Sequence, residues 1–370
     1  ITWAGGTNNA GTLDDDSRFS KGAHIAYWDN RLWIGNVNGA KYQLWRSNTG
    51  DITVWGATSF YNFDHDITGI SPIGNALAIH TDQGVHVLTP TGNATVPYQV
   101  QRRAPAGSVS GRGIVNLPSG LQLFPRPDGF YAWDGGSQVQ KISQALDGSR
   151  FWDSINTAKL HLSHGLYYPS TNEVWWFIPY GTSQATNNYV IVYNTILNCW
   201  FGPYTNMARD ASALVDDQPH AGGFNGFVYT HDKNDNDDTV AISSRFKTGA
   251  PPPMGADVRL RWLYARHYYD AQDAEYDVQV LQESSKITGT TERILMGETE
   301  AVLGSFTLNN SKLGGSSQAL YTDTELMGYD NSTALVYTNN ALNEPFTFRR
   351  VNLQYKPLGR FRRRKTVGVE

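Results

Sequence analysis

Tight turns recur in this 370-residue sequence at a nearly constant spacing, and each one interrupts a run of alternating apolar residues. The first turns of the successive units are Asp29-Asn30, Gly74-Asn75, Ser119-Gly120, Thr171-Asn172 and Asp216-Asp217, spaced 45, 45, 52 and 45 residues apart. Ten residues after the start of each turn comes a glycine: Gly39, Gly84, Gly129, Gly181 and Gly226. The turn and the glycine ten residues after it recur together five times, which indicates a structural repeat. The pairs Asn38-Gly39 and Asp128-Gly129 also supply the positive φ that two-residue hairpin turns need.

Each unit is predicted to be a meander of short strands. The expected strands are His24 to Trp28, Leu32 to Gly35 and Tyr42 to Trp45; Ile67 to Ile73, Ala76 to His80 and Val85 to Leu88; Gly113 to Leu117, Leu121 to Phe124, Phe130 to Trp133 and Gln138 to Ile142; Val174 to Ile178 and Tyr189 to Tyr193; and Ala211 to Val215 and Phe224 to Tyr229. A period of about 45 residues with three or four strands is typical of a β-propeller blade, whose sheet buries its apolar face on the next sheet. Five units span residues 23–232, and residues 1–20 with Val240 to Lys247 could complete a sixth blade.

The composition favours the same all-β fold class. With 11 Trp, 20 Tyr and 15 Phe, aromatic residues make up 12% of the sequence, whereas charged residues are 17% against a usual ~25%. The 36 Gly and 16 Pro mark many turns, so a helical or disordered protein is excluded. The single cysteine, Cys199, excludes an intramolecular disulfide and a zinc site of cysteines. No window approaches the ~18 consecutive apolar residues of a membrane span, so none is expected.

The repeat ends before the last third of the chain. After Asp238 the period fails, and Pro251 to Pro253 mark a boundary because prolines cannot pair within a sheet. Long alternating segments follow and predict an antiparallel sandwich: Val258 to Tyr269, Tyr276 to Leu281, Ser305 to Leu308 and Phe346 to Tyr355. We therefore expect a β-propeller with an N-terminal closing segment at residues 1–249, a β-sandwich-like domain at 250–356 and a basic C-terminal tail at 357–370.

Several stretches of the repeat share a pattern of turns and aromatic residues. They are His24 to Gly35 with Trp45 to Asp51, Ile67 to Pro72 with Gly84 to Leu88, Pro127 to Gly135, and Tyr193-Asn194 to Trp200. Over roughly residues 23–203 this pattern resembles the tail nozzle, or tail tubular, proteins of short-tailed bacteriophages. It contains no catalytic motif.

The resemblance implies a structural virion protein with no enzyme activity and no cofactor. Its implied partners are copies of itself in a hexameric ring, the portal or adaptor proteins, the tail fibre or tip proteins, and genomic DNA that passes through without sequence-specific binding. The implied location is the phage tail of the virion, assembled in the host cytoplasm. In such a ring the chain would hold and gate a conduit for DNA ejection.

Charge is unevenly distributed along the chain. The segment from Arg349 to Lys365 holds eight basic residues and no acidic one, so the formal net charge of −4 divides into +8 there and −12 elsewhere. The interface candidates are Arg349, Arg350, Arg360, Arg362, Arg363, Arg364 and Lys365. Three interpretations stay open: docking on an acidic surface of a neighbouring subunit, contact with nucleic acid, and a solvated terminus. An acidic channel wall would in turn repel phosphates and let DNA move.

One loop invites a calcium hypothesis. Asp232, Asp235, Asp237 and Asp238 are closely spaced carboxylates of the kind that hard cations prefer. Counted from Asp232, however, position six of an EF-hand is Asp237 where glycine is needed, and position twelve is Ser243 where glutamate is needed. A hydrated loop is the preferred interpretation.

Catalytic arrangements find little support. In Gly107 to Gly111, a valine occupies the place where a nucleophile elbow needs serine. His161 and His164 are three residues apart, which on a strand points them to opposite faces. His80 and His86 could face each other across a hairpin as a cross-strand pair. Cys199, next to Trp200, is interpreted as a small core residue.

The aromatic excess allows two functions. Exposed Trp and Tyr on propeller loops can stack on sugars, which would make this a carbohydrate-binding or glycan-hydrolysing propeller used in host adsorption. The tryptophans Trp28, Trp33, Trp45, Trp133, Trp175 and Trp176 lie inside predicted strands, however, where packing between blades explains them better. No pair of Asp or Glu recurs in a way that nominates a glycosidase site. The favoured hypothesis is therefore the structural tail protein, with the carbohydrate-binding propeller as the alternative.

Overall fold

The computed structural model describes most of the chain in two compact units, Ile1–Lys233 and Asn234–Glu370. The described residues are 22–37, 39–147, 151–205, 207–233, 236–237, 240–249, 253–254, 258–269, 276–284, 288–296, 320–341 and 346–360. In this part of the chain no helix is long and apolar enough to cross a membrane.

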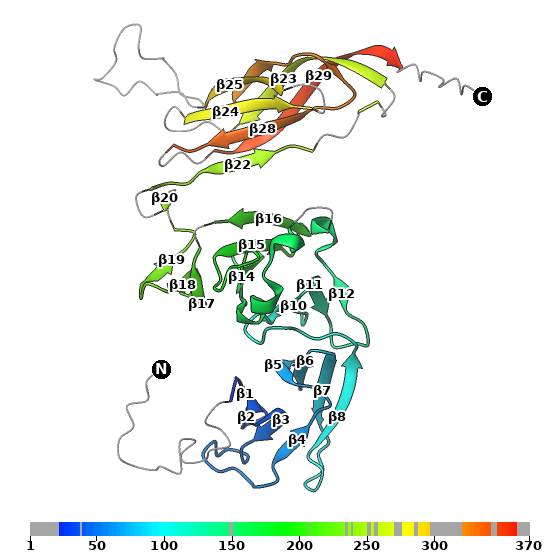
Figure 1. Cartoon of the computed structure of the whole chain (residues 1–370), viewed down its shortest axis with the longest axis vertical. Helices are drawn as coiled ribbons and strands as arrows, with labels where there is room; N and C mark the ends of the chain where they lie inside the picture. Colours follow the sequence, from blue (N-terminus) through cyan, green and yellow to red (C-terminus); the bar gives the residue numbers. More distant parts are fainter. Residues whose placement is uncertain are drawn as a thin grey trace, which may run out of the picture. The chain divides into compact units, whose positions relative to one another are not determined.

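Five antiparallel sheets follow one another along the first unit, and within each sheet every strand pairs with the next strand in the chain (Figure 1). The strands of the first two sheets are β1 (His24–Trp28), β2 (Arg31–Val37), β3 (Ala40–Arg46) and β4 (Phe60–Asn62), then β5 (Ile67–Ile73), β6 (Ala76–Thr81), β7 (Gly84–Pro90) and β8 (Tyr98–Ala104). The third sheet has β9 (Val115–Asn116), β10 (Gln122–Arg126), β11 (Gly129–Trp133) and β12 (Gln140–Lys141). The fourth has β13 (His164–Tyr168), β14 (Glu173–Ile178), β15 (Tyr189–Asn194) and β16 (Cys199–Tyr204), and the fifth has β17 (Arg209–Val215), β18 (Gln218–Gly223) and β19 (Val228–Thr230).

These sheets are the five blades that the repeat predicts, and the all-β propeller class is confirmed. Three short 3₁₀ helices lie between the third and fourth blades and account for the one longer spacing: η1 (Gln144–Leu146), η2 (Trp152–Ser154) and η3 (Thr157–Leu162). The insertion lengthens a connection while the strand pairing on either side keeps its order.

The first landmark turn of each unit joins the first and second strands of a blade. Its backbone is left-handed in all five blades, at Asp29 and Asn30, Gly74, Gly120, Asn172, and Asp216 and Asp217. Glycine adopts this conformation without a steric penalty, and Asn and Asp tolerate it better than other side chains. The recurrence of these three residue types at one spacing therefore reflects a left-handed residue in the first hairpin turn of every blade.

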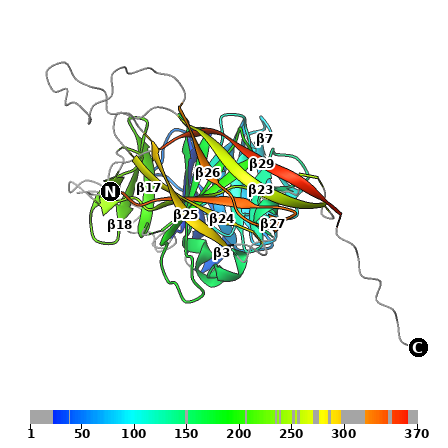
Figure 2. The same cartoon turned by 90° about the horizontal axis from the view of Figure 1, so that it is seen from above.

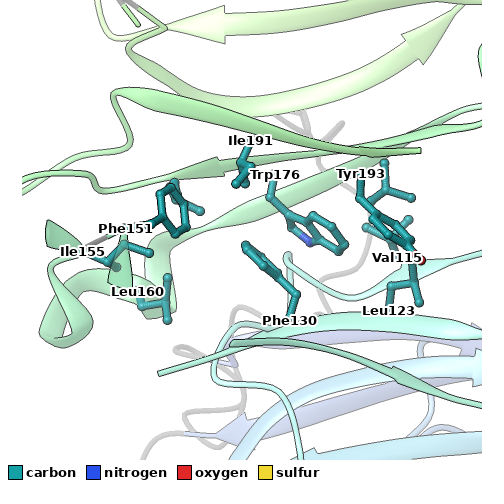
Figure 3. Packing of buried hydrophobic residues seen from close by; sticks show 11 residues of the cluster. Val115, Leu123, Phe130, Phe151, Ile155, Leu160, Trp176, Ile191 and Tyr193 are labelled. Carbon is teal, nitrogen blue, oxygen red and sulfur yellow. The ribbon is translucent and has the colours of Figure 1, made fainter. Parts of the chain in front are cut away.

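Neighbouring blades are held together by shared hydrophobic cores. Four clusters join the first to the second blade, the second to the third, the third to the fourth and the fourth to the fifth. Figure 3 shows the third of these, where Phe130 and Trp176 stack with their ring centroids 4.4 Å apart. Such pairs add specific geometry to a large buried apolar area. Each sheet thus buries its apolar face on the next one.

The fourth and outermost strand of several blades was missed by sequence analysis. Tyr98–Ala104 and Cys199–Tyr204 form full edge strands with exposed polar or irregular patterns. In the fifth blade the predicted strand Phe224 to Tyr229 is confirmed only at its end: Val228 and Tyr229 lie in β19, whereas residues 224–227 connect β18 to β19. Here Gly226 has a left-handed backbone with φ of 85°, which a continuous strand would not contain.

The second unit is a sandwich of two antiparallel sheets, as predicted. One sheet has the order β22 (Ser244–Lys247), β28 (Ala334–Asn339), β24 (Tyr276–Glu283) and β25 (Thr288–Met296). In the other, β23 (Val258–Tyr269) pairs with β26 (Leu320–Glu325), β27 (Tyr329–Asp330) and β29 (Phe348–Arg360); the long pair β23 and β29 runs side by side in Figure 2. A small hairpin, β20 (Asn236–Asp237) with β21 (Val240–Ala241), precedes them.

A single core joins the two sheets of the sandwich. Leu260 and Trp262 on β23 pack with Val278 and Val280 on β24 and with Tyr337 on β28. Alternation of buried and exposed residues along β23 gives each sheet one inner face.

Three sequence-based boundaries differ from the structure. The units divide between Lys233 and Asn234, earlier than the expected boundary at 249. The segment Ser244–Lys247 pairs with β28 of the sandwich and is therefore not a strand of a sixth blade. The expected tail from 357 onward begins inside β29, where Arg259 pairs with Gly359. Residues 1–20 and the predicted strand Ser305 to Leu308 lie outside the described residues.

Candidate functional site

The predicted interface residues fall partly on a strand and partly beyond the described chain. Arg349 and Arg350 are exposed on β29, and Arg360 is the last residue of that strand. Arg362, Arg363, Arg364 and Lys365 lie outside the described residues. The described part of the basic segment is therefore the edge strand of a sheet, with its side chains held in register by β23.

Strand alternation places many of these side chains on one outer face. Val351, Leu353 and Tyr355 pack on the sandwich core, so the residues between them point away from it. Arg350 lies opposite Tyr268, and Lys356 lies opposite Arg261. We call this outer surface of β23, β26, β27 and β29 the Arg/Tyr face; its members are Arg259, Arg261, Tyr264, Arg266, Tyr268, Tyr321, Asp323, Glu325, Tyr329, Arg350 and Lys356.

Guanidinium groups cover tyrosine rings across the Arg/Tyr face. The Cζ atom of Arg350 lies 4.4 Å from the ring centroid of Tyr268. Arg266 lies 4.6 Å from the centroid of Tyr321, and Arg259 lies 5.1 Å from that of Tyr329. These are cation–π distances. The rings hold long side chains that would otherwise be free to rotate, so the guanidinium groups are oriented before any partner arrives.

One ion pair fixes the middle of the face. Arg266 donates from Nε and from Nη2 to the two carboxylate oxygens of Asp323, each at 2.7 Å. These hydrogen bonds lower the pKa of Asp323 and raise that of Arg266. A bidentate pair of this kind is geometrically specific, although both side chains are too exposed for a large contribution to stability.

The Arg/Tyr face carries an excess of positive charge. Its cations are Arg259, Arg261, Arg266, Arg350 and Lys356, whereas its carboxylates are Asp323 and Glu325. Asp323 is already bonded to Arg266. Tyrosine and arginine are the residue types enriched where proteins bind one another.

A second candidate is a pocket in the propeller. It has a volume of about 410 Å³ and is lined by residues of η1, of η2 with the preceding Phe151, and of the fourth blade. Its lining is Leu146, Phe151, Ser154, Tyr180, Ile191, Trp200, Phe201, Gly202 and Pro203; Figure 3 shows Phe151 and Ile191 in the core beside it. The lining includes aromatic rings, the hydroxyls of Ser154 and Tyr180, and no carboxylate or histidine, so this pocket is suited to stacking on a ligand.

The second landmark glycines lie where the second strand of a blade connects to the third: Gly39, Gly181 and Gly226 are in the connection, and Gly84 and Gly129 begin the third strand. Gly39, Gly181 and Gly226 have positive φ. At Gly84 a Cβ would lie 2.6 Å from the carbonyl oxygen of Ala104, and at Gly129 it would lie 2.5 Å from the side chain of Lys141. Backbone conformation or close packing therefore explains each of these glycines.

The serine-rich stretch before the third blade forms buried hydrogen bonds between the second and third blades. The backbone N–H of Ser108 donates to Nδ1 of His80 at 3.1 Å, and the hydroxyl of Ser108 donates to the carbonyl of Ser110 at 2.7 Å. The other ring nitrogen of His80 bonds Gln122 at 3.1 Å. His80 is fully buried, which lowers its pKa to about 4. The expected His80 and His86 pair is wrong, because His86 lies opposite Ile79 and so points to the other face.

The other histidines and acids singled out from the sequence do not form the metal sites considered for them. His161 is exposed, whereas His164 is buried and stacks on Phe177 at 4.5 Å. Of the calcium candidates, Asp235 and Asp238 lie outside the described residues, Asp237 is in β20, and Asp232 is exposed. Within the described ranges, no three His, Cys, Asp or Glu side chains are arranged to hold a metal ion. Cys199 begins β16 and is half-buried.

No protein-family model and no curated protein matches this sequence. Among solved structures, the extracellular domain of BT4673 from B. thetaiotaomicron is similar at 12% identity and a TM-score of 0.45, over 62% of this chain and 28% of that one. BamB from Moraxella catarrhalis is similar at 12% identity and a TM-score of 0.39, over 57% of each chain. An exo-β-1,3-galactanase from Phanerochaete chrysosporium is similar at 9% identity and a TM-score of 0.31, over 90% of this chain and 95% of that one.

Only one edge of the Arg/Tyr face was predicted from the sequence. The basic run on β29 was among the interface candidates, whereas Arg259, Arg261 and Arg266 on β23, about ninety residues earlier, were not. The signal was present as basic and tyrosine residues alternating with buried ones in Val258–Tyr269. What the sequence could not give is the pairing of β23 with β29 and β26, which brings the three segments together.

Proposed function

We propose that this chain is a structural component of a bacteriophage tail, a rigid propeller that forms the wall of a ring-shaped conduit for DNA. The phage assignment is supported by the resemblance over roughly residues 23–203, and the solved structures named above add nothing to it. Its proposed partners are further copies of the chain in a ring of six, the portal or adaptor proteins, and the tail fibre or tip proteins. DNA would pass through without sequence-specific binding, and neither catalysis nor a cofactor is needed.

The observation that carries the structural role is where the aromatic residues lie. Trp33 and Trp176 are fully buried, and Trp28, Trp45 and Trp133 are nearly so. Trp45 packs within the first blade, and the other four rings hold successive blades together. The aromatic excess therefore rigidifies the propeller and leaves few strand tryptophans to bind a ligand. Only Trp175, of the six predicted, is half-buried.

Electron microscopy of the purified full-length chain tests this role. We expect closed rings in negative stain and a matching discrete oligomer by mass photometry. A chain that stays monomeric at every concentration, in low and in physiological salt, would contradict the proposal.

A second candidate is a carbohydrate-binding propeller used in adsorption to the host, and the aromatic pocket favours it. Trp200 and Tyr180 line the pocket with rings of the kind on which sugars stack, and Phe201, also in the lining, is 40% exposed. The pocket lining has no carboxylate, whereas glycoside hydrolysis uses two, so binding is favoured over hydrolysis.

A glycan array separates the two candidates. If the pocket binds a sugar, Phe201→Ala should lower the signal at least about tenfold, whereas the exposed Phe227→Ala, far along the chain in the fifth blade, should leave it unchanged. Absence of any glycan signal from the intact chain would remove this candidate and leave the structural role untouched.

A further inference from the structure

The Arg/Tyr face is suited to a protein and poorly suited to nucleic acid. Arg350, Arg266 and Arg259 already cover faces of Tyr268, Tyr321 and Tyr329. A nucleobase needs a free ring face on which to stack. Asp323 and Glu325 stand on the same surface and would repel phosphates. Oriented guanidinium forks next to tyrosines match the carboxylates of a protein surface instead.

The propeller unit of the same chain carries a surface of opposite charge. Tyr168 on β13 lies opposite Glu173, the first residue of β14, in the strand register. Its hydroxyl also lies near Asp217 in the β17–β18 turn and Asp232 after β19. Burial, a hydrogen bond to Asp232 and these negative charges together raise the pKa of Tyr168. Asp216 adjoins Asp217 in the turn, and Asp216, Asp217 and Asp232 are exposed. We call Glu173, Asp216, Asp217 and Asp232 the acidic cluster; Lys233 is the one basic residue that follows it directly in the chain.

We propose that the Arg/Tyr face of one copy docks on the acidic cluster of a second copy, which makes a head-to-tail contact between copies. This inference rests on the proposed structural function and names the surfaces through which the copies would meet. The two surfaces are different and complementary, so the contact is heterologous. Repetition of a heterologous contact closes into a ring when the rotation between copies allows it.

Charge complementarity is the argument for a second copy as the partner. The face has five cations and two carboxylates, and the cluster has four carboxylates. Outside the basic segment from Arg349 to Lys365 the chain carries −12. Contacts between exposed charges are screened by salt over about 8 to 10 Å at physiological ionic strength. Association is therefore expected to weaken steeply as salt is added.

Complementation between two full-length variants tests the contact directly. The face variant carries Arg259→Glu, Arg261→Glu and Lys356→Glu. The cluster variant carries Glu173→Gln, Asp216→Asn, Asp217→Asn and Asp232→Asn, which keep the side-chain shapes and the left-handed turn. A matched control carries Lys41→Glu, Arg103→Glu and Lys159→Glu, three exposed cations of the propeller.

Analytical ultracentrifugation at low salt should show self-association of the intact chain and of the control. Each variant alone should lose it by at least about tenfold in the dissociation constant. A mixture of the two should form a one-to-one dimer, because one intact face and one intact cluster remain. Circular dichroism of each variant should match that of the intact chain, since all substituted residues are exposed or half-buried.

Four other results would overturn the inference, and each has a different meaning. If the face variant associates as the intact chain does, the contact is wrong while the ring-forming role stands. If the mixture stays monomeric, the two surfaces are not partners. If a duplex DNA probe binds the intact chain and not the face variant, the face contacts nucleic acid. If the intact chain never associates, both this inference and the proposed function fail.

Discussion

Buried histidines show how single residues tie the fold together. His80 accepts a hydrogen bond from the backbone of Ser108 and bonds Gln122 of the next blade. In the sandwich, His267 bonds the hydroxyl of Tyr337 at 3.0 Å and that of Thr324 at 2.8 Å. Burial lowers the pKa of both histidines to about 4. A neutral ring that both donates and accepts is what these sites require, so the histidines are structural.

Acidification should weaken the fold through His80. Its pKa falls from 6.5 in the unfolded chain to about 4 in the folded chain, so protons bind the unfolded state first as the pH drops. Stability from this residue is complete above about pH 6.5 and is lost toward pH 4, by up to about 3 kcal/mol. Urea unfolding at about pH 7.5 and about pH 4.5 should show the gap between the intact chain and His80→Asn narrowing by roughly 2 kcal/mol. If the difference in unfolding free energy between the two proteins is the same at both pH values, His80 does not cause the loss of stability.

Gly107 should tolerate no side chain. A Cβ there would lie 2.3 Å from the carbonyl oxygen of Thr81 and 2.5 Å from that of Gly84, and backbone atoms cannot yield cheaply. We expect Gly107→Ala to lower the free energy of unfolding by about 1 to 3 kcal/mol. Gly222→Ala is the matched control, because nothing lies within 4 Å of its added Cβ. If the two variants are equally stable in urea, the backbone around Gly107 shifts to make room for the added Cβ, and the prediction is wrong.

At the level of elements, hairpins were predictable from sequence and most fourth strands were not; the exception is Gln138 to Ile142, which contains β12. The predicted strand Ile67 to Ile73 coincides with β5, and Val258 to Tyr269 coincides with β23, since their hydrophobic patterns and turn residues are local. Tyr98–Ala104 has five exposed residues between two buried ones, so it lacks the alternation that identifies a strand. The Arg/Tyr face was only half visible because it depends on pairing between segments far apart in sequence.

Truncation of one blade-to-blade aromatic residue should destabilise the propeller strongly. Trp176 is fully buried, stacks on Phe130 and donates from Nε1 to the carbonyl of Gly113 at 3.0 Å. Trp176→Ala should cost about 3 to 5 kcal/mol. Trp175→Ala, on the opposite face of the same strand and half-buried, should cost clearly less. Chemical denaturation followed by tryptophan fluorescence measures both, and a larger loss for Trp175→Ala would contradict the packing argument.

At the scale of the whole molecule, the chain joins a repeat architecture to a sandwich. In the propeller, hydrophobic cores are shared by consecutive blades. The stability of each blade therefore depends on its contacts with the neighbouring blades. The sandwich has one core of its own built from β23, β24 and β28. A unit with its own core can unfold as one cooperative body.

Two separable unfolding transitions are therefore expected in calorimetry of the full chain. Leu335 is fully buried in the sandwich core, so Leu335→Ala should cost about 2 to 5 kcal/mol and lower the midpoint of one transition only. Trp176→Ala, in the propeller, should lower the other one only. The two variants control for each other, since each leaves the second core intact. If either substitution shifts both midpoints together, the propeller and the sandwich form a single cooperative unit and the division between Lys233 and Asn234 has no thermodynamic counterpart.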